Sequence, residues 1–96
     1  MKEVRFARLG DYLKKKRCDA GLSQGDLAKA LKYTSPQFVS NWERGLCAPA
    51  FNAMPMLTQL LGIPKREMIG LILEQTEAEM EKTFSDFSSK KRKIAR

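Results

Sequence analysis

Apolar residues recur along this chain at intervals of three and four, the spacing that aligns side chains on one face of an α-helix. A first helix is predicted over residues 9–20, and Gly21 is suited to end it. A second is predicted over residues 24–32, with Ser23 as its cap and Asp26 in the first turn, where negative charge is favoured. The inward positions expected in the first helix are Leu9, Leu13, Cys18 and, as a further candidate, Tyr12. Those expected in the second are Leu27, Ala28 and Leu31.

A third, short helix is predicted between a proline and a glycine. Ser35 can accept the first free amide hydrogens, Pro36 is suited to the first helical position, and Gly45 is suited to the end. Val39 and Trp42 are three residues apart and share one face, which we expect to be buried.

The other face of this third helix is polar. It carries Gln37, Ser40, Asn41 and Arg44. Because amide side chains can form paired hydrogen bonds with base edges, this face is a candidate surface for reading DNA. The alternative is an ordinary solvated helix face.

Two more helices are predicted, over Asn52–Gly62 and Pro64–Phe84. No segment shows the sustained alternation of a strand, so the fold class is all-α. The last helix carries a heptad-like, only partly apolar seam, which consists of Ile69, Leu73, Thr76, Met80, Thr83 and Phe87. A bundle of this size would not cover the helix beyond Gln75, so Met80 and Phe84 are predicted to bury against a second copy of the chain. A solvated helix is the alternative.

Charge is unevenly distributed along the 96 residues, whose formal net charge is +7. Residues 1–50 contain 10 basic and 5 acidic side chains, residues 51–84 contain 3 and 5, and residues 85–96 contain 5 and 1. The basic first half includes the candidate reading helix, which indicates either a polyanionic partner or simple solubility. The basic end, residues 85–96, is predicted to fray.

The composition also narrows the functional classes. There is no run of roughly 18 apolar residues and no apolar segment after the first residues, so no membrane span is predicted and a cytoplasmic location is expected. Cys18 and Cys47 occur without any histidine, so no metal site is expected, and reduced core cysteines are favoured over a disulfide. Without histidine, a paired-carboxylate motif or a glycine-rich phosphate loop, neither an enzyme nor a cofactor is expected.

Three segments resemble the helix-turn-helix of the Cro and phage-repressor family, also called the xenobiotic-response-element family. They are Gly21-Leu22-Ser23-Gln24, Leu27-Ala28 and Val39-Ser40-Asn41-Trp42-Glu43-Arg44-Gly45. The similarity covers about residues 9–73. It implies a compact, lambda-repressor-like bundle of four or five helices, whose second motif helix enters the major groove while the first crosses the phosphate backbone.

The resemblance implies a role for individual positions. Base edges would be read by Pro36, Gln37, Ser40 and Asn41. Where the family usually has a turn glycine, this chain has Lys32 and Tyr33, which would bring the following residues within reach of phosphate or bases. The expected phosphate contacts are Ser23, Gln24, Tyr33, Thr34, Ser35, Arg44 and, from the basic patch of the first helix, Lys14. Arg17 and Glu43 match positions that form a structural ion pair.

The sequence thus predicts a helix-turn-helix DNA-binding domain over residues 1–75, and an extended C-terminal helix with a basic tail over residues 76–96. The expected function is that of a homodimeric regulator of transcription, a repressor encoded by a bacterium or phage and acting at the nucleoid. It would bind half-sites in double-stranded DNA about 34–36 Å apart. The alternative is an interaction module, such as an antitoxin or coactivator, that binds a protein partner through its last helix.

Overall fold

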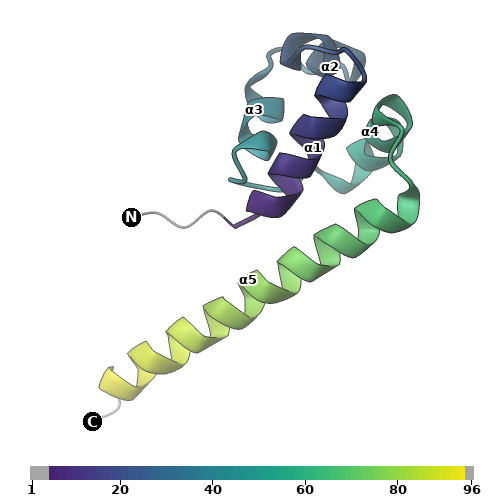
Figure 1. Ribbon diagram of the computed structural model, residues 1–96. Helices are drawn as coiled ribbons and strands as arrows, with labels where there is room; N and C mark the ends of the chain where they lie inside the picture. The colour runs from purple at the N-terminus through teal and green to yellow at the C-terminus, as the bar shows by residue number, and fades with distance from the viewer. Residues whose placement is uncertain (1–4, 95–96) are drawn as a thin grey trace.

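The computed structural model describes residues 5–94, and side chains as far as residue 88. It contains α1 (Ala7–Asp19), α2 (Gln24–Ala30), α3 (Gln37–Glu43), the 3-10 turn η1 (Phe51–Ala53), α4 (Met54–Leu61) and α5 (Lys65–Ile94). No strand occurs among the described residues. The first four α-helices form a bundle, and α5 passes beneath it and continues outward (Figure 1). The predicted all-α fold with an extended last helix is confirmed.

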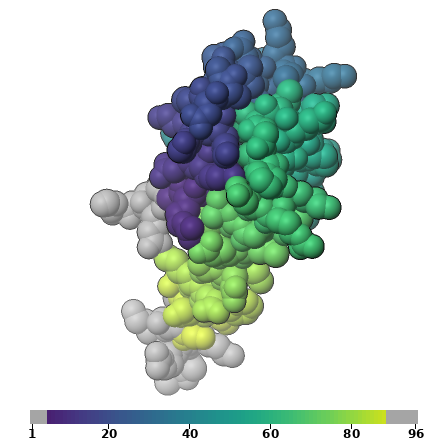
Figure 2. Space-filling model, turned by 45° about the vertical axis from the view of Figure 1, so that its right-hand side comes forward, coloured from purple at the N-terminus to yellow at the C-terminus, as the bar shows by residue number. Residues whose placement is uncertain are grey.

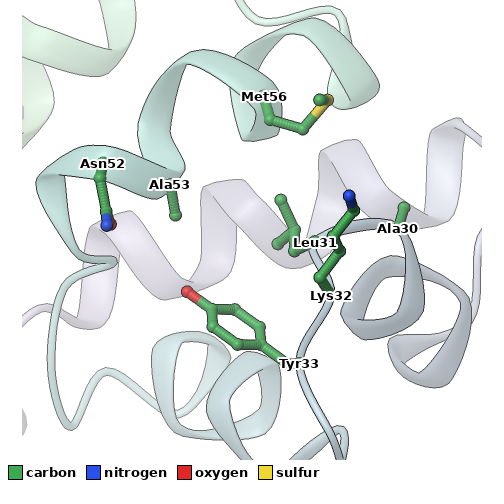
Figure 3. A pocket seen from close by; sticks show the side chains of 7 residues that line it. All are labelled: Ala30, Leu31, Lys32, Tyr33, Asn52, Ala53 and Met56. Atoms are coloured by element: carbon green, nitrogen blue, oxygen red, sulfur yellow. The ribbon is translucent and has the colours of Figure 1, made fainter.

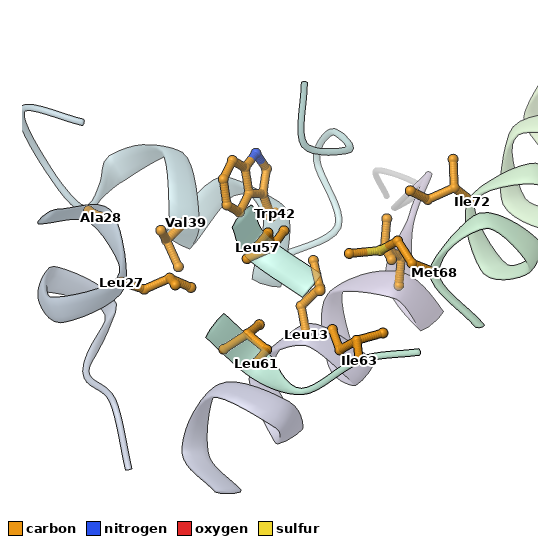
Figure 4. Close-up of a cluster of buried hydrophobic side chains, with 11 residues drawn as sticks. Leu13, Leu27, Ala28, Val39, Trp42, Leu57, Leu61, Ile63, Met68 and Ile72 are labelled. Carbon is orange, nitrogen blue, oxygen red and sulfur yellow. The ribbon is translucent and has the colours of Figure 1, made fainter. Parts of the chain in front are cut away.

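One cluster of buried side chains, to which all five α-helices contribute, forms the core (Figure 4). Its members are Leu9, Leu13, Leu27, Ala28, Val39, Trp42, Leu57, Leu61, Ile63, Met68 and Ile72. Burying one large side chain of this kind contributes about 1.5–3 kcal/mol relative to leaving it exposed. The core therefore holds α3 firmly, because both Val39 and Trp42 belong to it.

The cysteines do not belong to this core. Cys18 was predicted to point inward, but it is exposed, and so is Cys47, and both are free thiols. Cys18 comes five residues after Leu13, which places it on the solvent side of α1. Arg17, four residues after Leu13, takes the inward position.

The helix boundaries differ from the prediction at the turns. α2 ends at Ala30, and Lys32 adopts a left-handed conformation with φ of 66°, so a lysine fills the place of a turn glycine. α3 begins at Gln37, one residue later than predicted, and the Ser35 hydroxyl accepts the Gln37 amide hydrogen at 3.3 Å. Asn52, which was expected to begin the fourth helix, lies inside η1, and α4 begins at Met54.

α1 and α3 approach each other most closely at Gly10. A Cβ atom at this position would lie 2.6 Å from the carbonyl oxygens of both Glu43 and Trp42. Both neighbours are backbone atoms at the end of α3, so they cannot rotate away as a side chain could. The glycine therefore sets how near α1 lies to the C-terminal end of α3.

α5 extends further than predicted, because no helix-breaking residue follows Gly70. It continues to Ile94, so residues 85–94, which were expected to fray, are helical. Its first part packs on the bundle, where Met68 and Ile72 are buried and the Gln75 Oε1 atom accepts the Leu9 amide hydrogen at 3.0 Å. The later part projects beyond the bundle (Figure 2), and the molecule is 56 Å along its longest axis.

Candidate nucleic-acid interface

The helix-turn-helix begins with a closed hydrogen-bonded cap on α2. The Ser23 hydroxyl accepts the Asp26 amide hydrogen at 2.9 Å, and the Asp26 carboxylate accepts the Ser23 amide hydrogen at 3.0 Å. These bonds from the backbone and side chain of Ser23 lower the pKa of Asp26, because they favour its charged form. The start of α2 is therefore structurally defined before any ligand binds.

The buried side of α3 determines which side faces outward. Val39 and Trp42 are almost completely buried, whereas Gln37 and Arg44 are exposed. Ser40 and Asn41 are partly exposed, and Pro36 is exposed just before the helix. The structure thus brings the predicted base-reading residues together along one strip, which we call the α3 outward face and define as Pro36, Gln37, Ser40, Asn41 and Arg44.

Hydrogen bonds connect three members of the α3 outward face. The Asn41 Oδ1 atom accepts a hydrogen bond from Gln37 Nε2 at 2.9 Å and another from Arg44 Nη2 at 2.9 Å. No other described residue engages the Asn41 Nδ2 donors or the Gln37 Oε1 acceptor. Gln37 therefore presents an acceptor and Asn41 presents donors beside it, and the hydrogen bonds orient both side chains.

A buried ion pair ties α1 to the end of α3. The Arg17 guanidinium donates to Glu43 through Nε at 2.5 Å and Nη2 at 3.0 Å, and it donates to the Leu22 carbonyl through Nη1 at 2.8 Å. The side chains are 11% and 4% exposed. The hydrogen bond with Glu43 raises the pKa of Arg17. The structure contains the ion pair that the family resemblance implied, and both of its side chains are largely buried, unlike those of the α3 outward face.

Gln24 is placed differently from the expectation. Its Nε2 atom donates to Glu43 Oε1 at 2.9 Å, so the side chain completes the buried ion pair. The side-chain amide was expected to bind phosphate, but in this structure one of its two Nε2 hydrogens is donated to Glu43.

Tyr33 also contributes to packing. Its ring stacks on Phe38 with centroids 4.8 Å apart and meets Trp42 edge-on at 5.8 Å. It lines a hollow of about 220 Å³ between the α2–α3 turn and the η1–α4 segment (Figure 3), together with Asn52 and Met56. Because the Tyr33 ring is packed against Phe38 and Trp42, the hydroxyl group is the part of Tyr33 that is proposed to contact DNA.

Other predicted phosphate contacts lie at the surface. Thr34, Ser35 and Lys14 are exposed. In the basic patch of α1, Lys15 pairs with Asp19 at 3.2 Å and Lys16 lies 5.6 Å above the Tyr12 ring, whereas Lys14 makes no ion pair within the described part of the chain. Lys14 is therefore the lysine of this patch whose charge is least engaged by the protein.

α5 carries an apolar stripe, which we call the α5 apolar face and which continues from the part beside the bundle onto the projecting part. It consists of Ile69, Leu73, Met80, Phe84 and Phe87. At 100° per residue, these five positions lie within about 60° of one another around the helix. Met80 is 54% exposed and Phe84 is 68% exposed, so the two predicted dimer residues are uncovered in the single chain.

Among the described residues, no helix is long and apolar enough to cross a bilayer. In that same part of the chain, no three side chains of the metal-ligating types come together as a group that could hold an ion.

Comparison with known proteins identifies the class. The sequence model of the helix-turn-helix family matches residues 13–68, more than half of the chain, so the chain belongs to this family. It is a helix-turn-helix DNA-binding protein of the Cro and phage-repressor type.

A solved structure adds the functional class. The crystal structure of the clp gene regulator ClgR from C. glutamicum is similar, with 26% sequence identity and a TM-score of 0.55. The alignment covers 81% of this chain and 95% of that chain. A search of curated proteins found no match. The protein is accordingly a DNA-binding regulator of transcription.

Proposed function

We propose that this protein represses transcription by binding a specific double-stranded DNA sequence with the α3 outward face. The observation that carries the proposal is the Gln37–Asn41–Arg44 hydrogen-bond network, which orients two amide side chains on an otherwise solvent-facing strip. Side chains that are already oriented lose less conformational freedom when they bind. Repression would occur by occlusion, because a protein bound at a promoter blocks access to that promoter.

The chemistry of the network favours an adenine. The major-groove edge of adenine offers the N6 amino group as a donor and N7 as an acceptor. The Gln37 Oε1 acceptor and the Asn41 Nδ2 donors form the complementary pair. Arg44, held against Asn41 at the end of α3, would bind the adjoining phosphate, while Pro36 and Ser40 would contact the neighbouring base edges.

The remaining phosphate contacts are proposed from the start of α2, the α2–α3 turn and α1. They are Ser23, Tyr33, Thr34, Ser35, Lys14 and Gln24, the last through the second hydrogen of Nε2, because the first is donated to Glu43. Phosphate contacts position a protein on the duplex without reading its sequence. Replacing one of them should therefore weaken binding to all duplexes alike.

The substitution Asn41→Ala tests the reading role. It removes the shared acceptor and one base contact, so binding to the specific site should weaken by about 5- to 150-fold, the range for one paired base contact. Binding to a scrambled duplex should change less than about twofold, because phosphate contacts dominate it. Gln59→Ala is the matched control, because it removes an exposed amide from α4. An equal loss on specific and scrambled duplexes would reject the reading role of Asn41.

We also propose that the regulator is a homodimer joined through the α5 apolar face. Five apolar residues in one stripe, uncovered in the single chain, support this arrangement. Two reading helices would then meet two half-sites, about 34–36 Å apart if the spacing is one helical turn. Sedimentation of the wild-type protein at tens of micromolar should give a dimer mass, and the Met80→Glu/Phe84→Glu variant should give a monomer mass. A monomer mass for the wild type would reject the dimer.

The same exposed stripe favours a second candidate function, the binding of a protein partner as in an antitoxin or coactivator. In that case the chain would co-purify with a stoichiometric partner, and the Met80→Glu/Phe84→Glu variant would not. For both candidate functions we propose that the protein is not an enzyme and that it acts in the cytoplasm of a bacterium, at the nucleoid.

A further inference from the structure

An exposed phenylalanine lies at the edge of the α3 outward face. Phe38 is 49% exposed and directly follows Gln37. At 100° per residue it lies about 60° around the helix from Asn41. The other exposed large apolar side chains of the described residues are in the loop after α3, in η1, in α4 and in α5. Phe38 is therefore an apolar group placed beside the polar atoms that are proposed to contact bases.

The ring of Phe38 is held by its neighbours. It stacks on Tyr33 at 4.8 Å with an interplanar angle of 29°, and Tyr33 meets the buried Trp42 edge-on. This row of three rings connects the exposed edge of Phe38 to the core. A side chain that is already fixed can contact a partner without a large loss of rotamer freedom.

We propose that Phe38 contacts the C5-methyl group of a thymine, next to the base pair that Gln37 and Asn41 contact. The thymine methyl is the apolar group that the major groove displays, and phenylalanine is one of the side chains suited to it. The residues that adjoin Phe38 on the α3 outward face are polar. A surface that mixes polar and apolar groups fits the edges of base pairs better than it fits the uniformly apolar surface of a protein partner. This inference rests on the proposed function, because it requires α3 to enter the major groove.

The test replaces thymines of the specific site one at a time with deoxyuridine, which removes the methyl group and leaves the hydrogen-bonding atoms of the base unchanged. For the wild-type protein, uracil at one position of each half-site should weaken binding about fourfold, the factor that corresponds to about 0.8 kcal/mol for one buried carbon group. For Phe38→Ala, the ratio of thymine to uracil affinity at that position should fall to about one.

Two further variants complete the design. Phe38→Leu keeps an apolar side chain and should retain part of the preference for thymine. Phe51→Ala removes another exposed phenylalanine, in η1, and should retain all of it. Because each variant is compared on two duplexes that differ by a methyl group, a general loss of stability or affinity cancels in the ratio.

The possible outcomes are separable. If Phe38→Ala keeps the full uracil penalty, another residue contacts the methyl group and the inference is wrong. If the wild type binds a specific site but is insensitive to every uracil, or if the site contains no thymine, the inference is wrong and the proposed function stands. If the protein binds no sequence specifically, the proposed function fails and the inference with it.

Discussion

Removing the guanidinium group of Arg17 should be one of the most destabilising single changes in the chain. Arg17→Met keeps the length and most of the apolar volume of the side chain. It leaves the Glu43 carboxylate, 4% exposed, without its charged partner. It also leaves the Leu22 carbonyl without the donor that now lies 2.8 Å away.

The magnitude follows from the burial of the pair. Breaking a buried ion pair by removing one partner costs about 3–5 kcal/mol, mostly because a charge remains uncompensated. We expect about 3 kcal/mol here, because Gln24 still donates to Glu43 at 2.9 Å. For a domain of this size, a loss of about 3 kcal/mol lowers Tm by roughly 12–24 °C.

Urea and thermal unfolding, followed by circular dichroism, measure the effect. The double variant Arg17→Met/Glu43→Leu removes both charges, so it should be more stable than Arg17→Met alone, with a coupling free energy of about 2 kcal/mol. Lys15→Ala is the control, because its pair with Asp19 is exposed and should contribute no more than about 0.5 kcal/mol.

Either of two results would show that the Arg17–Glu43 pair does not stabilise the fold in this way. One is that Arg17→Met unfolds within about 1 kcal/mol of the wild type. The other is that the two substitutions are additive in the double variant, because independent sites add and an ion pair does not.

Three other substitutions have predictable effects on stability, two of them at glycines and one that depends on pH. Gly10→Ala should lower the free energy of unfolding by about 2 kcal/mol, because the added methyl group meets backbone oxygens at 2.6 Å and overpacking of this kind exceeds the gain in helix propensity. Gly70→Ala, where nothing lies within 4 Å of the added atom, should raise it by about 1 kcal/mol in the same urea titration; a similar loss at both glycines would contradict the close approach. Asp26→Asn should lower Tm at pH 7. The difference in Tm from the wild type should shrink as the pH falls below 3.8, the ordinary pKa of the group, because the lowered pKa of Asp26 means that its ionised form stabilises the fold and is lost on protonation. A difference in Tm that stays constant down to pH 2 would show that the charge of Asp26 is not responsible.

Much of the bundle follows from local rules that can be read in the sequence. The spacing of Val39 and Trp42 correctly gave the buried side of α3, and hence the outward position of Gln37 and Asn41. The capping pair of Ser23 and Asp26 correctly gave the start of α2. These features depend on residues within four positions of each other, so no knowledge of the tertiary fold is needed to predict them.

The predictions were wrong where segments distant in the sequence meet, or where two neighbouring residues compete for one inward position on a helix. Cys18 was chosen as an inward residue because it is small and apolar, but the ion pair with Glu43 in α3 brings Arg17 inward instead. The role of Gly10 depends on backbone atoms more than 30 residues away, so the one visible indication was a glycine inside a helix, where it costs about 1 kcal/mol relative to alanine.

The hydrogen bonds between side chains could not be predicted from the sequence either. The spacing of Gln37, Asn41 and Arg44 predicts a shared face, but not that Asn41 accepts from both neighbours. The aromatic row from Phe38 through Tyr33 to Trp42 joins α3 to the preceding turn, in which Lys32 has a left-handed conformation. A lysine in that conformation is uncommon, so its position was not predictable from residue type alone.

Selection of duplexes from a randomised DNA library, with the purified protein at near-physiological salt, tests directly whether α3 reads a DNA sequence. We expect enrichment of an inverted repeat whose half-sites contain an adenine next to a thymine, and loss of that preference in Asn41→Ala. If the protein retains DNA in a salt-dependent way but enriches no sequence, α3 does not read DNA, because the basic charge alone would then explain binding.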